Sequence, residues 1–74
     1  MGKIILRLDR VMVERQMSLG DLANHVGITN ANMSKIKNNK VTAIRFSTLE
    51  KICEVLECTP GDIIEFENSN AEDK

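Results

Sequence analysis

Hydrophobic residues recur at helical spacing in several separate segments of this chain. In the first segment, Leu8, Val11 and Met12 fall on one helical face and predict a helix over Leu8–Gln16. A run of strand-like residues, Ile4–Leu6, precedes that helix and predicts a short strand. The N-terminal segment is therefore expected to combine a strand with a helix.

Capping residues mark the next two helices. Ser18 is a favourable N-cap, Asp21 follows in the first turn, and Gly27 suits the left-handed residue that ends a helix. Thr29 is the N-cap of the following helix and stands only two residues beyond Gly27. So short a turn fixes the angle between the two helices. The apolar face of the first of them consists of Leu19, Leu22, Ala23 and Val26.

The helix after Thr29 has a narrow apolar face. Met33 and Ile36 lie three residues apart and form its inner side, and Asn38 and Asn39 end it. The pattern therefore leaves most of this helix outside the core. The residues expected to be more exposed are Asn30, Ala31, Asn32, Ser34, Lys35 and Lys37.

The strongest periodic signal follows a loop over residues 40–43. It predicts a helix over Phe46–Glu57 with Cys53 in the core. Arg45 is a poor N-cap for this helix, whereas Ser47 is chemically better but would start it late, and we expect the earlier start. The residues that repeat at i, i+3, i+4 and i+7 are Leu49, Ile52, Cys53 and Leu56.

The C-terminal segment predicts one helical turn and a strand. Thr59 is an N-cap followed by Pro60 at the first helical position, where its missing N–H does no harm. Residues 63–67 then alternate as in a short strand, which pairs either with Ile4–Leu6 or with another subunit. We expect residues 1–67 to form one domain and residues 68–74 to form a disordered polar tail.

Composition narrows the class of protein. A chain of 74 residues makes one small domain, and without Trp or Tyr its core must consist of Leu, Ile, Val and Met. There is neither a signal peptide nor an apolar run long enough to span a membrane, so we expect a cytoplasmic protein. No catalytic arrangement of Ser, His, Cys and Asp and no glycine-rich phosphate loop is present, which argues against an enzyme and against a cofactor.

The metal and redox candidates are few. Cys53 and Cys58 are the only cysteines and no histidine cluster accompanies them, so neither a disulfide framework nor a zinc site is indicated. We expect reduced thiols, and a redox or metal sensor built on these two cysteines stays open as an alternative. His25, the only histidine, is expected to be a surface residue at a helix end.

Charge is distributed unevenly along the chain. Residues 1–46 carry eight basic and three acidic side chains, a balance of +5, whereas residues 47–74 carry two basic and eight acidic ones, a balance of −6. Between Thr29 and Arg45 there are four cations and no anion, so a polyanion would meet this segment first. A merely solvated helix face would have the same composition.

Two short helices joined by a tight turn and followed by a packing helix are the arrangement that places a recognition helix in the DNA major groove. The run Met17–Thr29, continued by Ser34–Lys40, resembles the Xre family of Cro/C1-type phage-repressor helix-turn-helix proteins. Residues 48–53 and 56–63 resemble the last helices of its small single-domain members, so the resemblance covers about residues 4–67. The chain is also similar to VanU-type regulators of vancomycin-resistance operons.

This resemblance implies an all-α, compact five-helix lambda-repressor-like DNA-binding domain with short terminal β-strands. Its implied partner is double-stranded DNA, and its implied role is a transcriptional regulator, specifically a repressor. A homodimer is expected because one recognition helix covers only a few base pairs. No small-molecule ligand is indicated. The alternative is a protein-interaction or antitoxin-like module, because the acidic C-terminal half could bind a basic partner protein.

The resemblance also assigns contacts to DNA. Its base-contacting positions correspond here to Asn30, Ala31, Asn32 and Lys35. The chemistry agrees, because Asn can bind adenine through two hydrogen bonds, Ala can touch a thymine methyl and Lys can donate to guanine. Arg45 could instead reach a minor groove. The side chains expected to contact the phosphate backbone are Thr29, Ser34, Lys37, Asn38, Lys40 and Arg45.

The chain departs from the family pattern at three positions. Leu19 stands where the family often has a Gln that contacts a phosphate, so that contact is in doubt here. Asn39 replaces the usual glycine after the recognition helix, and Asn is the residue besides glycine that best tolerates a left-handed conformation. Lys37 replaces a Glu and adds positive charge beside the DNA.

Overall fold

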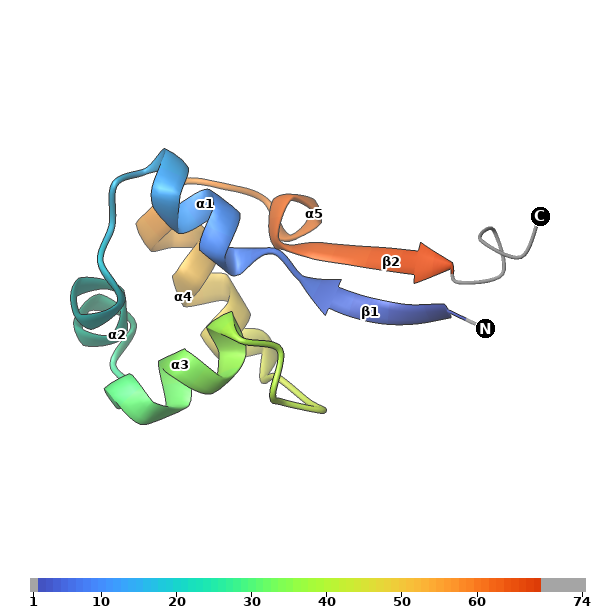
Figure 1. Ribbon diagram of the computed structural model, residues 1–74. Helices are drawn as coiled ribbons and strands as arrows, with labels where there is room; N and C mark the ends of the chain where they lie inside the picture. The colour runs from blue at the N-terminus through green and yellow to red at the C-terminus, as the bar shows by residue number, and fades with distance from the viewer. Residues whose placement is uncertain (1, 69–74) are drawn as a thin grey trace.

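The computed structural model describes residues 2–68 as a helical body from which two paired strands project (Figure 1). The expected all-α, compact five-helix arrangement with short terminal strands is found in this part of the chain, and the two strands pair in a small sheet. The elements in chain order are β1 (Gly2–Leu6), α1 (Leu8–Glu14), α2 (Leu19–Val26), α3 (Asn30–Lys37), α4 (Phe46–Leu56), α5 (Pro60–Ile63) and β2 (Ile64–Asn68).

Within residues 2–68 the core is entirely apolar and consists of aliphatic side chains and methionines, as the composition predicts. Met33 and Ile36 of α3 belong to it. Cys53 does not, contrary to the sequence pattern, because α4 turns Ile52 and Leu56 inward and leaves Cys53 only partly buried at the margin. The buried residues are Leu6, Leu8, Val11, Met12, Leu22, Ala23, Met33, Ile36, Ile52, Leu56 and Ile63.

Two helices end earlier than their hydrophobic patterns predict. The first, α1, ends at Glu14 rather than at Gln16, because Gln16 has a left-handed backbone with φ 55°. Likewise α4 ends at Leu56 because Glu57 takes φ 52°. The start of α4 is as expected, after Arg45, whose side chain makes no capping hydrogen bond. At the C-terminal end of each of these two helices, the backbone conformation of one residue therefore overrides the hydrophobic periodicity.

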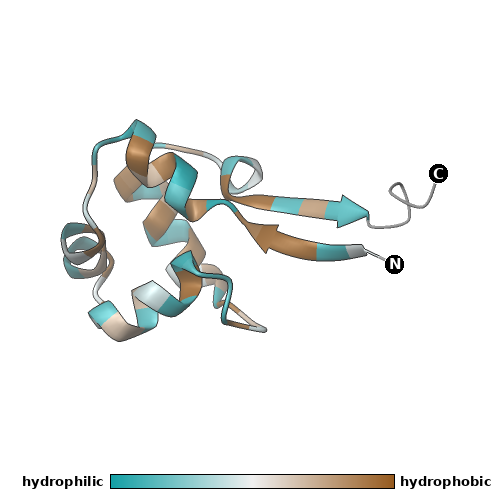
Figure 2. Ribbon diagram, in the orientation of Figure 1, coloured by the Kyte–Doolittle hydropathy of each residue, from teal (hydrophilic) through white to brown (hydrophobic). Residues whose placement is uncertain are grey.

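The sheet joins the two ends of the domain. β1 and β2 are antiparallel, with a register that runs from Gly2 opposite Asn68 to Leu6 opposite Ile64. Of the two pairings left open by the sequence, the chain itself therefore provides β2's partner. Asn68 belongs to β2 rather than to the expected tail, and the remaining tail residues, 69–74, lie outside the described residues. Figure 2 shows that most of β1 is hydrophobic whereas β2 alternates.

Ion pairs fasten the base of this two-stranded ribbon to α1. Glu65 of β2 accepts hydrogen bonds from Arg7 Nε at 2.9 Å and from Arg10 Nη2 at 3.1 Å. These bonds, first from Arg7 and then from Arg10, lower the pKa of the Glu65 carboxyl. Farther out, Ile4 and Phe66 face each other across the strands and are 60% and 65% exposed. No helix within residues 2–68 is long and apolar enough to cross a membrane.

Candidate DNA-binding interface

The turn between α2 and α3 is built by two capping residues, as the sequence predicts. Gly27 has φ 91°, and its N–H donates to the Ala23 carbonyl at 2.8 Å, which closes α2. The Thr29 hydroxyl accepts a hydrogen bond from the Asn32 N–H at 3.1 Å and so opens α3. Because these caps are local, the crossing of α2 and α3 is determined within a few residues.

Helix α3 packs against the core with one face and exposes the other to solvent. Its inner residue Met33 is fully buried and Ile36 is nearly so. The four expected base-contacting residues all remain exposed: Asn30, Ala31, Asn32 and Lys35. At about 100° per residue, Ala31 and Lys35 lie near the centre of the outer face, whereas Asn30 and Asn32 lie on opposite flanks. These side chains are therefore free to meet a groove, though not all in one direction.

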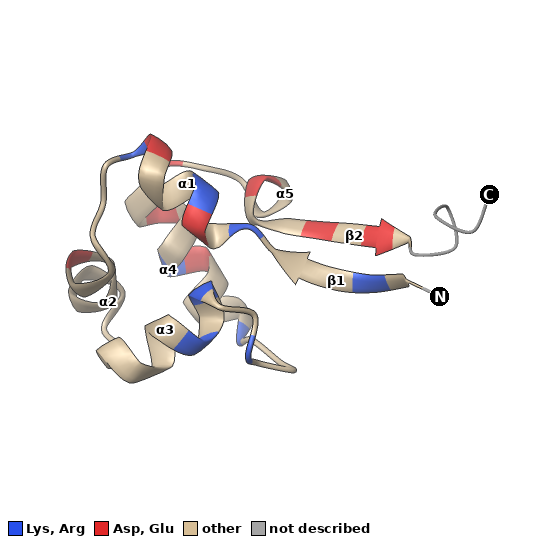
Figure 3. Ribbon diagram, in the orientation of Figure 1, with Lys and Arg blue, Asp and Glu red and all other residues tan. Residues whose placement is uncertain are grey.

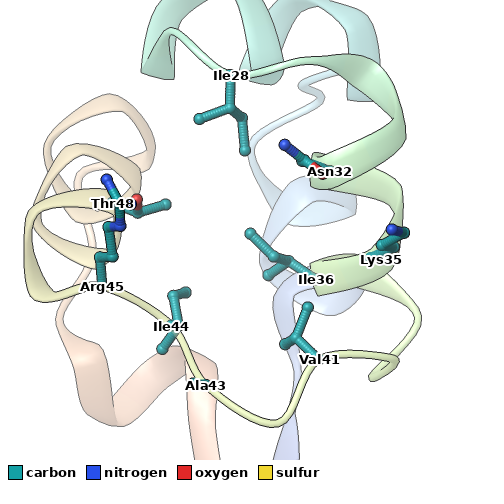
Figure 4. Close-up of a pocket in the computed structure, with 9 residues that line it drawn as sticks. All are labelled: Ile28, Asn32, Lys35, Ile36, Val41, Ala43, Ile44, Arg45 and Thr48. Carbon is teal, nitrogen blue, oxygen red and sulfur yellow. The ribbon is translucent and has the colours of Figure 1, made fainter.

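A hollow of about 370 Å³ separates α3 from the start of α4 (Figure 4). Asn32 and Lys35 line it from α3, and Arg45 and Thr48 line it from the other side. Thus the fold brings Arg45 close to two candidate base-reading residues, although it is distant from them in sequence. Between these polar walls lie the apolar side chains Ile28, Ile36, Val41, Ala43 and Ile44.

Thr48 is a site residue that the sequence analysis does not identify. It lies partly buried in the first turn of α4, three residues after Arg45, and its side chain faces the hollow (Figure 4). The spacing of i and i+3 places both residues on one helical flank. That spacing was available in the sequence, but the direction of the flank depends on how α4 packs against α2.

The positive charge around α3 is not neutralised by an ion pair within residues 2–68. Figure 3 shows Lys and Arg along the second half of α3 and in the loop that follows, whereas Asp and Glu lie on α1, α2, α4, α5 and β2. Both ion pairs found within residues 2–68 use Glu65, and neither includes a cation of α3 or its loop. The cations that remain available for an external anion are Lys35, Lys37, Lys40 and Arg45.

The six expected phosphate contacts divide by exposure. Thr29, Asn38, Lys40 and Arg45 are exposed, whereas Ser34 and Lys37 are only partly so. Asn38 Nδ2 donates to Ser34 Oγ at 3.2 Å, so these two side chains already have one another as partners. The Thr29 oxygen is engaged as a cap but its hydroxyl hydrogen is free to donate. Of the three cations expected to contact phosphate, Lys40 and Arg45 are therefore more accessible than Lys37.

Of the two cysteines, Cys58 does not have the properties of a reactive sensor. Both are free thiols and both are partly buried. Burial, reinforced by the neighbouring Cys53, raises the pKa of the Cys58 thiol to about 11. Because the thiolate is the reactive form, a raised pKa makes Cys58 less reactive at neutral pH.

A helix-turn-helix with an exposed, cation-flanked second helix defines a class of DNA-binding protein. The family model of the Cro/C1-type HTH DNA-binding domain matches residues 7–69. The chain belongs to this family, which confirms the resemblance drawn from the sequence.

Relatives agree with this assignment. The chain is 54% identical over 63 residues to YozG of Bacillus subtilis strain 168, an uncharacterized HTH-type transcriptional regulator, covering 85% of this chain and 75% of that protein. The N-terminal DNA-binding domain of SinR from Bacillus subtilis is 30% identical, with a TM-score of 0.66 over 72% of this chain and 77% of that one. The transcriptional regulator VanUg is also 30% identical, with a TM-score of 0.71 over 88% and 85% of the two chains.

Proposed function

We propose that this DNA-binding protein regulates transcription by reading an operator in the major groove with α3, and that it acts as a repressor. The observation that carries the proposal is the combination of an exposed α3 face with four cations that have no carboxylate partner within residues 2–68. The transcriptional regulators YozG and VanUg, to which the chain is similar, support the same role. In this role the protein binds DNA in the cytoplasm and catalyses no reaction.

The proposed contacts divide into those that read bases and those that fix register. Asn30, Ala31, Asn32 and Lys35 are assigned to base edges, with Lys35 donating to guanine and the Asn side chains pairing with adenine. The phosphate contacts are assigned to Thr29, Ser34, Lys37, Asn38, Lys40 and Arg45, which position the protein without reading sequence. Arg45 and Thr48 line the α4 side of the hollow, and from there both are assigned contacts with the DNA.

A binding experiment tests the operator proposal directly. The purified protein is titrated with its own upstream DNA and with a scrambled fragment at roughly 150 mM salt, which suppresses non-specific attraction. Preference for the native fragment by about a thousandfold, the low end for specific binders, is expected. Equal and weak binding to both fragments would contradict sequence-specific reading.

Repression is assigned to a homodimer that binds two half-sites about 34 Å apart. The sheet is the proposed dimer surface, because the cross-strand pair Ile4 and Phe66 exposes apolar area outside the core. The Phe66 ring and the Glu67 carbonyl also lie so close to Gly2 that a side chain at this position would require the ring to shift.

Sedimentation in the presence of operator DNA tests the dimer. Ile4→Lys should reduce the mass of the complex from two subunits towards one, because it places a charge in the apolar patch. Val13→Lys is the matched control, since Val13 is 77% exposed on α1, away from the sheet. One wild-type subunit per operator, or identical dimers of wild type and Ile4→Lys, would exclude the sheet interface.

A second candidate function is an interaction with a partner protein. A groove of about 570 Å³ runs along α4, and Phe46 beside it is 81% exposed. Its apolar lining of Phe46, Leu49, Cys53 and Pro60 is flanked by Glu50 and Glu54, which favours an amphipathic segment carrying Lys or Arg. Glu54→Gln should then weaken repression of a reporter gene while operator affinity stays unchanged. Unchanged repression would count against this function.

A further inference from the structure

Asn39, the residue two positions after the end of α3, forms an unusual pair of hydrogen bonds. Its Oδ1 accepts from the backbone N–H of Leu6 at 2.6 Å, and its Nδ2 donates to the backbone carbonyl of the same Leu6 at 3.0 Å. Both bonds are partly buried and join positions 33 residues apart in the chain. One carboxamide therefore satisfies both backbone groups of a single strand residue.

The partner of Asn39 is itself firmly placed. Leu6 is 8% exposed, belongs to the core and ends β1, where it lies opposite Ile64. In an antiparallel pair, alternate residues direct their N–H and C=O away from the neighbouring strand. The Asn39 side chain forms hydrogen bonds with both of these groups at Leu6. For this one residue it therefore replaces the hydrogen bonds that a neighbouring strand would make. The attachment point is therefore a rigid part of the fold.

The same residue also closes α3. Asn39 has φ 61°, its N–H donates to the Ile36 carbonyl at 3.2 Å, and the next N–H, of Lys40, donates to the Lys35 carbonyl at 2.8 Å. These backbone bonds connect Asn39 rigidly to the last turn of α3. Asn39 therefore links the end of that helix to β1, while the turn from Gly27 to Thr29 holds its beginning.

We propose that Asn39 is a positioning residue for DNA recognition: by binding Leu6 it fixes the angle at which α3 presents Asn32 and Lys35 to the bases. This inference rests on the proposed function of α3. Glycine would allow the same backbone conformation but has no side chain to bind Leu6. Aspartate keeps the acceptor but loses the donor until it is protonated. The carboxamide is the group that both bonds require at neutral pH.

The variants Asn39→Gly and Asn39→Asp test this role by their selectivity, defined as affinity for operator over scrambled DNA. Asn39→Gly should lower selectivity about tenfold, because a loosely held α3 meets the bases in several orientations, while the salt dependence of binding to scrambled DNA stays unchanged. Asn39→Asp should lose selectivity at pH 7.5 and partly recover it as the pH falls towards about 4, the ordinary pKa of Asp. Wild-type protein is measured at each pH for comparison.

Glu57→Gly is the matched control, because Glu57 ends α4 with φ 52° and its exposed side chain makes no hydrogen bond or ion pair found within residues 2–68. It should leave selectivity unchanged. Wild-type selectivity in Asn39→Gly, with only a lower melting temperature, would overturn the proposal and make Asn39 a purely structural residue. Absence of selectivity in the wild-type protein itself would instead overturn the proposed function, so the two failures are distinguishable.

Discussion

Arg15 donates a hydrogen bond from Nε to the backbone carbonyl of Leu56 at 2.7 Å, and its Nη2 reaches the carbonyl of Glu57 at 3.2 Å. The last carbonyls of a helix have no partner within the helix and carry partial negative charge. Arg15 therefore caps the C-terminal end of α4 from a position 41 residues earlier in the chain. This contact ties the segment that follows α1 to the helix that supports the DNA-binding face.

Removing that cap should destabilise the whole domain. Arg15→Ala is expected to lower the free energy of unfolding by about 2 kcal/mol, as for a hydrogen bond from a charged group. Urea denaturation followed by circular dichroism measures the change. Arg15→Lys keeps the positive charge but loses the planar guanidinium group. Its free energy of unfolding should therefore lie between those of wild type and Arg15→Ala. Equal stability of wild type and Arg15→Ala would show that water replaces the cap at no cost.

The N-cap of α3 should affect both stability and DNA binding. Thr29→Ala is expected to cost about 1 kcal/mol of stability through the lost bond to the Asn32 N–H, and to weaken operator binding by removing a proposed phosphate donor. Ser18→Ala is the matched control, because Ser18 caps α2 by the same geometry. It should cost similar stability without changing the affinity of the folded protein. Parallel effects of both variants on DNA would contradict the assignment of Thr29.

Salt titrations should separate phosphate contacts from base contacts. Lys40→Gln is expected to reduce the slope of log affinity against log salt by about 0.9 without altering sequence preference. Lys35→Ala should instead relax preference at one base pair, by about 1–3 kcal/mol. Lys51→Gln, an exposed position on α4, serves as the control and should change neither quantity. The division of roles fails if Lys35 and Lys40 variants behave alike.

Acidification should weaken the ion pairs that Glu65 of β2 forms with Arg7 and Arg10. Hydrogen bonds from Arg7, then Arg10, hold the pKa of Glu65 below its ordinary 4.5, so the folded carboxyl stays charged at lower pH than the unfolded one. The charged Glu65 carboxyl therefore contributes fully to the free energy of unfolding above pH 4.5. This contribution is lost as the pH falls through the lower pKa that Glu65 has in the folded protein. Glu65→Gln should be less stable than wild type at pH 7, and this difference should shrink on acidification.

Urea midpoints between about pH 3 and 7 measure this effect, in the range where carboxyl groups titrate. Glu54→Gln provides the control, because Glu54 is exposed on α4 and makes no ion pair within residues 2–68. A difference between wild type and Glu65→Gln that is constant with pH would rule out the ionic contribution.

Cys58 should react slowly with alkylating agents. Because burial raises its pKa from 9.0 to about 11, the thiolate fraction at pH 7.5 is lowered roughly a hundredfold relative to an ordinary thiol. Iodoacetamide labelling followed by peptide mass spectrometry measures the rate at Cys58, and the urea-unfolded protein provides the reference. Rapid labelling of the native protein, accompanied by loss of DNA binding, would revive the redox-sensor alternative.

Local sequence signals predict the helix-turn-helix well, because the interactions behind them join residues three or four positions apart. Ser18 and Thr29 cap the helices for which the sequence predicts them, and Gly27 ends α2. The same holds for Thr59, whose N–H donates to the Asp62 carboxylate at 3.0 Å at the start of α5. Such signals also predict the family and four of the exposed residues of α3, whereas Ser34 and Lys37 are only partly exposed.

The tertiary structure alone decides the contacts between distant segments. The binding of Asn39 to Leu6 and of Arg15 to Leu56 depends on where two backbones pass one another, which neither residue type nor spacing encodes. For the same reason the sequence leaves the partner of β2 open, assigns Cys53 to the core and does not identify Thr48 beside Arg45. Caps and periodicity determine each element from its own residues, whereas the packing of the elements determines which side chains meet.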